Sequence, residues 1–246
     1  MTRHVLLNNI DHQNSRVIHY FGPEFGDNVP SALVFPTEFI ELQKEYPILL
    51  RKDDPQGSYQ AIALLGFSRE ENLYLNEQHP IGWDARYIPA SLEKGPFLIG
   101  FQRSMGMQDE EPNAVVHIDM SHPKVSTEQG QQLFLSQGGN SPYLEHISAR
   151  LQTIHQGTAL APIFYSALEQ LELVESVTIE FALQNGDKIR LLGNYCINEQ
   201  RLATLPADAL ARLQQSGFLA LIYAMVFSMG TIRHLIERKN SLQSQQ

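Results

Sequence analysis

The sequence contains a single cysteine, Cys196, among 246 residues, so no disulfide can form within the chain. Low cysteine usage is typical of proteins in reducing compartments. Export signals are equally scarce, since the apolar run at residues 5–7 is far shorter than the roughly 7–15 residues of a secretory signal. We therefore expect a cytoplasmic protein.

A long hydrophobic run is also missing. The longest uncharged stretch, residues 216–232, is shorter than the about 20 mostly apolar residues of a membrane-spanning helix. Ser216, Gly217, Ser228 and Gly230 interrupt it. This composition predicts a buried helix and no membrane span.

Basic residues are few. Lys and Arg number 18 against 27 Asp and Glu, which gives a formal net charge of −9. Because neutralisation of phosphates supplies most of the affinity for nucleic acids, this balance argues against a nucleic-acid partner. It also argues against docking on an anionic membrane. Apolar residues make up 43% of the chain, which is typical of a folded globular protein.

Motifs of common catalytic sites are absent from the sequence. It has no Gly-x-Ser-x-Gly elbow, and Gly138-Gly139 lacks the Lys-Ser/Thr that completes a phosphate loop. Gly22 and Gly26 lack the flanking strand and helix of a dinucleotide site. No Cys-His pattern surrounds Cys196, so a buried structural thiol is the better interpretation. We predict no cofactor, and whether the chain is an enzyme stays open.

The elements that are present predict an α+β fold. Turn residues in the first 30 positions indicate an irregular arm, followed by a single domain over residues 31–238 and a disordered tail over residues 239–246. Asn185-Gly186 between two alternating runs predicts a β-hairpin. Antiparallel strands are predicted at residues 46–50, 59–67, 72–75, 96–103 and 113–119, and helices at residues 37–44, 142–155, 159–173, 206–215 and 218–239.

Several short motifs resemble the SapC family over roughly residues 30–238. One departure is Glu93-Lys94-Gly95 before Pro96, where the family usually carries a basic pair. The motifs are Phe35-Pro36-x-x-Phe39, Tyr46-Pro47-Ile48, Glu71-Asn72-Leu73, Trp83-Asp84-Ala85-x-Tyr87-Ile88-Pro89-Ala90, Pro96-Phe97, Ile118-Asp119, Leu192-Gly193-x-Tyr195 and Asn198-Glu199-x-Arg201-Leu202.

The resemblance implies a role as the partner of another protein and does not imply a particular reaction. The family has no established catalytic residues, and its members tend to be encoded beside halogenase-like proteins, cupin-like proteins and TonB-dependent receptors. The resemblance therefore implies an accessory protein for a modification or uptake system. The surface-layer role in the family name does not fit a chain without an export signal.

Two groups of residues are candidates for a site. Trp83, Asp84, Arg86 and Tyr87 combine types that are frequent in recognition hot spots, so this segment is a candidate ligand or partner site. The alternative is that Trp83 and Tyr87 are core aromatics, while Asp84 and Arg86 hold the loop by local hydrogen bonds.

His117 and Asp119 are weak candidates for metal ligands. On a strand, residues two apart face the same way, and His122 lies nearby in the sequence. A distal histidine would complete a facial triad. A strand end with solvated polar groups is the favoured interpretation, so we expect no metal.

Two functions stay open at this point. The first is a non-enzymatic interaction protein, in which the apolar helix over residues 218–230 lies in the core or forms a homodimer contact through Met225 and Met229. The second is a protein that binds a small molecule or peptide, or a metal-dependent enzyme, with its pocket around residues 83–89. The sequence favours the first.

Overall fold

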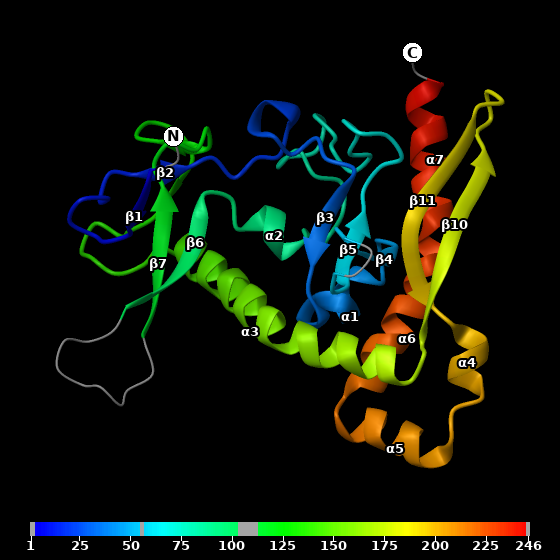
Figure 1. Cartoon of the computed structure of the whole chain (residues 1–246). Coiled ribbons are helices and arrows are strands. Elements are labelled where there is room, and N and C mark those ends of the chain that lie inside the picture. Colours follow the sequence, from blue (N-terminus) through cyan, green and yellow to red (C-terminus); the bar gives the residue numbers. More distant parts are fainter. Residues whose placement is uncertain (1–2, 55–56, 103–112, 245–246) are drawn as a thin grey trace.

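The computed structural model describes residues 3–54, 57–102 and 113–244 (Figure 1). The chain is 37% helical and 24% strand, which confirms the α+β fold. The strands are β1 (His4–Leu6), β2 (Arg16–Val17), β3 (Ser31–Val34), β4 (Ile48–Arg51), β5 (Gln60–Leu64), β6 (Phe97–Gln102), β7 (Asn113–Asp119), β8 (Val125–Ser126), β9 (Gln131–Gln132), β10 (Val174–Ala182) and β11 (Lys188–Ile197). The helices are η1 (Pro23–Phe25), η2 (Pro36–Glu38), α1 (Phe39–Leu42), α2 (Ala90–Glu93), α3 (Pro142–Gln170), α4 (Glu199–Ala203), α5 (Ala207–Gln215), α6 (Phe218–Ser228), η3 (Met229–Thr231) and α7 (Ile232–Gln243).

A five-stranded antiparallel sheet in the order β10-β11-β4-β5-β3 forms the centre of the molecule. β4 and β5 are nearly continuous apolar runs, and their side chains are buried on both faces. Helix α6 packs against β4 and β11, and Ser228 Oγ accepts a 2.9 Å hydrogen bond from the Ile48 amide. The predicted strands at 46–50 and 59–67 are thus the middle of this sheet.

The predicted hairpin is β10–β11, which stands beside α7 at one side of the molecule (Figure 1). Its turn closes through hydrogen bonds from Gly186 N to Leu183 O and from Leu183 N to Asp187 O. Gly186 has φ 92°, which is why a glycine is favoured at this point of the turn. The register slips between Val177 and Ile179, where Leu192 and Gly193 lie opposite the single residue Thr178, so β11 carries a bulge.

Two three-stranded sheets, β1-β7-β6 and β8-β2-β9, form a second lobe. In the segment expected to be an irregular arm, residues 1–30, the described part carries two short strands: β1 pairs with β7, and β2 pairs with both β8 and β9. These strands are too short to carry an alternating pattern, so their partners decide that they form. The prediction of a strand at 72–75 is wrong, since Asn72 holds this segment in a turn by bonding the Asp27 carbonyl and the Tyr74 amide.

The two helices predicted at 142–155 and 159–173 are one continuous helix, α3. Ser141 caps it as expected, accepting from the Leu144 amide. Gly157 does not end the helix. A Cβ at this position would overlap the side chain of Phe35, so the glycine allows close packing of α3 on the segment that follows β3. Pro162 lies inside α3 and removes one backbone hydrogen bond without ending the helix.

The last helical segment runs from α6 through η3 to α7 and ends at Gln243, so the prediction of a disordered tail from residue 239 is wrong for residues 239–243. Lys239 donates a hydrogen bond to Glu71 there.

Met225 is fully buried and cannot contact a second copy, whereas Tyr223 and Phe227 are exposed and stack at 5.7 Å. Among described residues, 218–243 alone form a helix long and apolar enough to cross a membrane, a test that core helices also pass.

Within the described ranges, buried apolar residues form two separate clusters. The large core gathers around the five-stranded sheet and includes Trp83, Phe39 and Phe164. Helix α3 is shared, because its first half faces the small core and its second half faces the large core. The small core consists of Val17, Phe97, Ile118, Leu133, Phe134, Leu144, Ile147 and Leu151.

Candidate functional site

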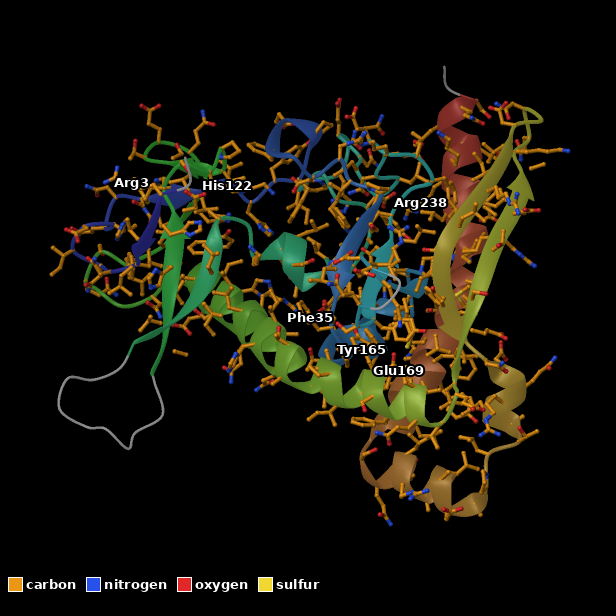
Figure 2. The ribbon with its side chains drawn as sticks, viewed as in Figure 1. Arg3, Phe35, His122, Tyr165, Glu169 and Arg238 are labelled. Carbon is orange, nitrogen blue, oxygen red and sulfur yellow. The ribbon has the colours of Figure 1, made fainter. Side chains whose placement is uncertain are left out.

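An open cavity of about 330 Å³ lies between the second half of α3 and the edge of the five-stranded sheet; we call it the α3–β5 pocket. Figure 2 labels Phe35, Tyr165 and Glu169, which lie around it. Its walls are mostly apolar. The pocket is lined by Leu33, Val34, Phe35, Ser58, Tyr59, Gln60, Thr158, Ala161, Pro162, Tyr165, Ser166 and Glu169.

The pocket forms because β3 leaves the sheet early. β3 pairs with β5 only as far as Val34, which lies opposite Ala61, and the chain then turns into η2 at Pro36. The Ala61 amide donates a 3.0 Å hydrogen bond to the hydroxyl of Tyr165, so a side chain of α3 accepts the bond that a longer β3 would accept. The β5 backbone before Ala61 therefore has no β3 partner, and α3 lies across this open edge.

The pocket contains backbone and side-chain groups that can form hydrogen bonds. Burial raises the pKa of Tyr165 to about 12, so its hydroxyl keeps its proton at neutral pH and can donate. Pro162 has no N–H, which leaves the Thr158 carbonyl without its usual helical donor. A mostly apolar cavity with a few polar groups is the usual character of a binding site.

One ion pair borders the pocket. Lys52 Nζ lies 3.7 Å from Glu169 Oε1 and 4.1 Å from the centre of the Tyr59 ring. The side chain of Lys52 is 17% exposed, whereas that of Glu169 is 52% exposed. The carboxylate is therefore the charge that an approaching molecule meets first.

Trp83 lies in the large core and is fully buried. Its ring stacks on Tyr74 at 6.0 Å, and its Nε1 donates a 2.9 Å hydrogen bond to the Tyr46 hydroxyl. Burial also raises the pKa of Tyr46 well above its ordinary value. Trp83 thus follows the alternative interpretation, in which it is a core aromatic.

Asp84 and Arg86 hold their loop, and Asp84 also borders a second cavity. Arg238, labelled in Figure 2, donates to Asp84 Oδ2 at 2.8 Å and to the Asp84 carbonyl at 2.7 Å, and these bonds join the loop to α7. The second cavity is a polar groove of about 750 Å³ that is lined by Asp84, Arg238, His234 and neighbouring residues. The Arg86 side chain is exposed, and its amide donates to Glu45 at 2.9 Å.

Tyr87 belongs to a chain of polar contacts where α2 and η2 pack on α3; we call it the polar seam. Glu38 Oε2 accepts hydrogen bonds from the Tyr87 hydroxyl and the Ala90 amide, both at 3.0 Å. Burial raises the pKa of Glu38. The guanidinium of Arg150 lies 5.1 Å from the centre of the Tyr87 ring.

Glu93 completes the seam from α2. Its Oε1 lies 2.7 Å from His146 Nε2, and its Oε2 lies 2.8 Å from Arg150 Nε, in an ion pair at an angle too poor for a hydrogen bond. Glu93 is buried, and both partners come from α3. The seam thus ties η2, α2 and α3 together by charge.

His117 and Asp119 lie on β7 in the second lobe, where Figure 2 labels Arg3 and His122. The ring of His117 packs over Gly100 on β6. Asp119 Oδ1 accepts from Ser121 Oγ at 2.6 Å and from the Arg3 amide at 2.9 Å, and these bonds lower the pKa of Asp119 to about 2. Across the described ranges, no three His, Cys, Asp or Glu side chains gather as potential metal ligands.

A family model for SapC matches residues 7–235. The chain belongs to the SapC family. The match begins directly after β1, upstream of the motifs in the sequence, and includes β2. No curated protein and no solved structure matches the chain.

The SapC motifs lie mainly in the core and the polar seam. Trp83 is buried, and Tyr87 bonds Glu38. Reasoning from sequence missed the α3–β5 pocket, because its lining comes from β3, β5 and α3, which are far apart in the chain. The nearest signals in the sequence are Gly157, which lies between the helices predicted at 142–155 and 159–173, and Pro162, which lies near the start of the second.

Proposed function

We propose that this SapC protein is a non-enzymatic interaction protein whose α3–β5 pocket receives an apolar side chain of a partner polypeptide. The observation that carries the proposal is the open apolar cavity beside a sheet edge that β3 leaves unpaired. A volume of about 330 Å³ is at the small end of the roughly 300–1,000 Å³ of ligand pockets, and suits a side chain better than a large cofactor.

The partner class follows from the resemblance described above. An accessory protein for a halogenase-like, cupin-like or uptake protein needs a surface that holds another chain, and the pocket offers one. The alternative, a ligand site centred on residues 83–89, has less support, because Trp83 is fully buried and Asp84 is the one residue of this segment that lines the polar groove.

A blocked pocket tests the proposal. Ser166 lines the pocket and is exposed, so Ser166→Trp would fill the cavity from α3 without disturbing the core. Ala159→Trp is the matched control, because Ala159 is exposed on the same helix and does not line the pocket. Each variant is co-expressed with a neighbour-encoded halogenase-like or cupin-like protein, and complexes are weighed by native mass spectrometry.

The proposal predicts a complex of fixed ratio that Ala159→Trp keeps and Ser166→Trp loses. A complex that survives Ser166→Trp would contradict the assignment of the pocket. A bare chain carrying an extra small mass, which Ser166→Trp removes, would instead favour a small-molecule ligand.

A homodimer through the C-terminal helix is a separate proposal. Its contact would use Tyr223 and Phe227, which are exposed, and not the buried Met225. Sedimentation of the wild type and of Phe227→Asp tests it. The proposal predicts a dimer that the variant converts to a folded monomer, and a monomeric wild type would contradict it.

A further inference from the structure

We propose that the α3–β5 pocket binds its partner as a short extended strand, with an apolar side chain in the cavity and a basic residue beside it, facing Glu169. This inference rests on the proposed function and adds the conformation and the chemistry of the bound segment. It is carried by the backbone groups at the open end of β5, the apolar walls and the unequal exposure of Lys52 and Glu169.

The backbone of β5 offers a place for an added strand. The Leu65 amide donates to the Pro30 carbonyl and the Leu64 amide donates to the Pro47 carbonyl. The backbone N–H and C=O groups of the odd-numbered residues in β5 therefore point toward β3. By the same alternation, the backbone N–H and C=O of Tyr59 point toward the edge beyond the end of β3, and β3 does not pair with them. Main-chain hydrogen bonds at an open sheet edge are the usual source of affinity when a peptide adds a strand.

Helix α3 limits the length of that strand and adds to its recognition. The Thr158 carbonyl, freed by Pro162, can accept from a bound amide, and the Tyr165 hydroxyl can donate to a bound carbonyl. Because α3 crosses the open edge, only a few residues fit between the helix and β5. A free hydrocarbon would leave these polar groups unused, whereas a peptide backbone satisfies them.

The walls select one apolar side chain. Leu33 and Val34 from β3, and Phe35 directly after it, line the cavity together with Ala161 and Pro162 from the helix. Leu33 is 42% exposed in the free protein, so a side chain that enters the cavity covers it. The area thereby removed from water favours a large apolar residue over alanine.

The charges beside the cavity favour a basic residue next to the apolar residue of the bound segment. The ammonium of Lys52 is already held by Glu169 and by the ring of Tyr59, and its side chain is largely shielded. The more exposed Glu169 carboxylate favours a cation, and the net charge of −9 favours a basic segment over long range.

The test uses four synthetic decapeptides, titrated against the whole protein by NMR chemical-shift perturbation. The first is a Gly-Ser host with a central Lys-Phe pair, and the others replace Phe by Ala, replace Lys by Glu, or N-methylate the Phe amide. We expect the Ala peptide to bind more than tenfold more weakly, because the aromatic ring no longer buries apolar area in the cavity. N-methylation should weaken binding by about tenfold through one lost hydrogen bond, and Lys to Glu by about threefold at a partly exposed carboxylate.

Protein variants separate this inference from the proposed function. Glu169→Gln should abolish the preference for Lys over Glu, and Glu145→Gln, an equal charge change at the far end of α3, should keep it. The inference fails if Ser166→Trp blocks the Lys-Phe peptide but N-methylation and the Lys to Glu change have no effect, while the proposed function then stands. Both fail if no peptide shifts pocket resonances and Ser166→Trp also leaves the partner complex intact.

Discussion

The two hydrophobic cores differ in how they are enclosed. The large core surrounds β4 and β5, which are buried on both faces, and is covered by α1, α3 and α6. The small core lies mainly between β6, β7 and the first half of α3, and the strands β1 and β9 around it keep mostly exposed side chains. The second lobe therefore depends on a helix that it shares with the larger one, and the polar seam fixes that helix.

The largest expected effect comes from removing an aromatic ring from each core. Trp83→Ala should lower the free energy of global unfolding by about 3–5 kcal/mol, because it leaves a large cavity and breaks the bond to Tyr46. Phe97→Ala should mainly open the second lobe. Hydrogen exchange distinguishes the two outcomes, since Phe97→Ala should expose the amides of β6 and β7 and leave β4 and β5 protected. Equal loss of protection in both sheets would show that the cores unfold as one unit.

The next effect concerns the polar seam. Glu93→Ala removes the carboxylate between His146 and Arg150 and should cost about 2 kcal/mol, below the 3–5 kcal/mol of a fully buried pair because Arg150 keeps some exposure. Urea unfolding measures the loss. Glu145→Ala, at an exposed position of the same helix, is the control and should cost much less. An equal cost for both variants would mean that the seam does not stabilise the contact between α2 and α3.

A smaller effect is expected where α3 passes from one core to the other. Gly157→Ala gains about 1 kcal/mol of helix propensity but loses about 1–3 kcal/mol through overlap with Phe35, so the net change should be destabilising. Thermal unfolding of this variant beside Ala159→Gly, a change in the opposite direction at an exposed site, separates propensity from packing. A higher melting temperature for Gly157→Ala would mean that Phe35 can move away from α3.

The smallest effect is a pH dependence confined to the second lobe. The pKa of Asp119 is lowered from 3.8 to about 2 in the folded chain. A lowered carboxyl pKa stabilises the fold fully above the unfolded value and loses this contribution as pH falls from about 4 toward 2. Amides of β1 and β7 should therefore lose protection over this range, and Asp119→Asn should remove that part of the pH dependence. An unchanged profile in Asp119→Asn would contradict the role of these hydrogen bonds.

Local pattern was enough to predict several elements of this protein. The Asn185-Gly186 turn predicted the β10–β11 hairpin, Ser141-Pro142 predicted the start of α3, and the apolar runs predicted β4 and β5. These features succeed because their physical causes lie within a few residues: turn geometry, capping and periodicity. The motifs also identified the SapC family, which the match over residues 7–235 confirms.

Tertiary packing decided the rest. Gly157 lies in the gap between the helices predicted at 142–155 and 159–173, yet its close contact with Phe35 makes the glycine favourable within one long helix. β1 and β2 exist because of partners about a hundred residues away. Trp83 is a further example. The residue types of its segment suggested a recognition site, whereas its packing against distant residues places it in the core. The α3–β5 pocket is a space left between three distant segments, and such a space depends on where β3 leaves the sheet, which only the packing of the whole chain sets.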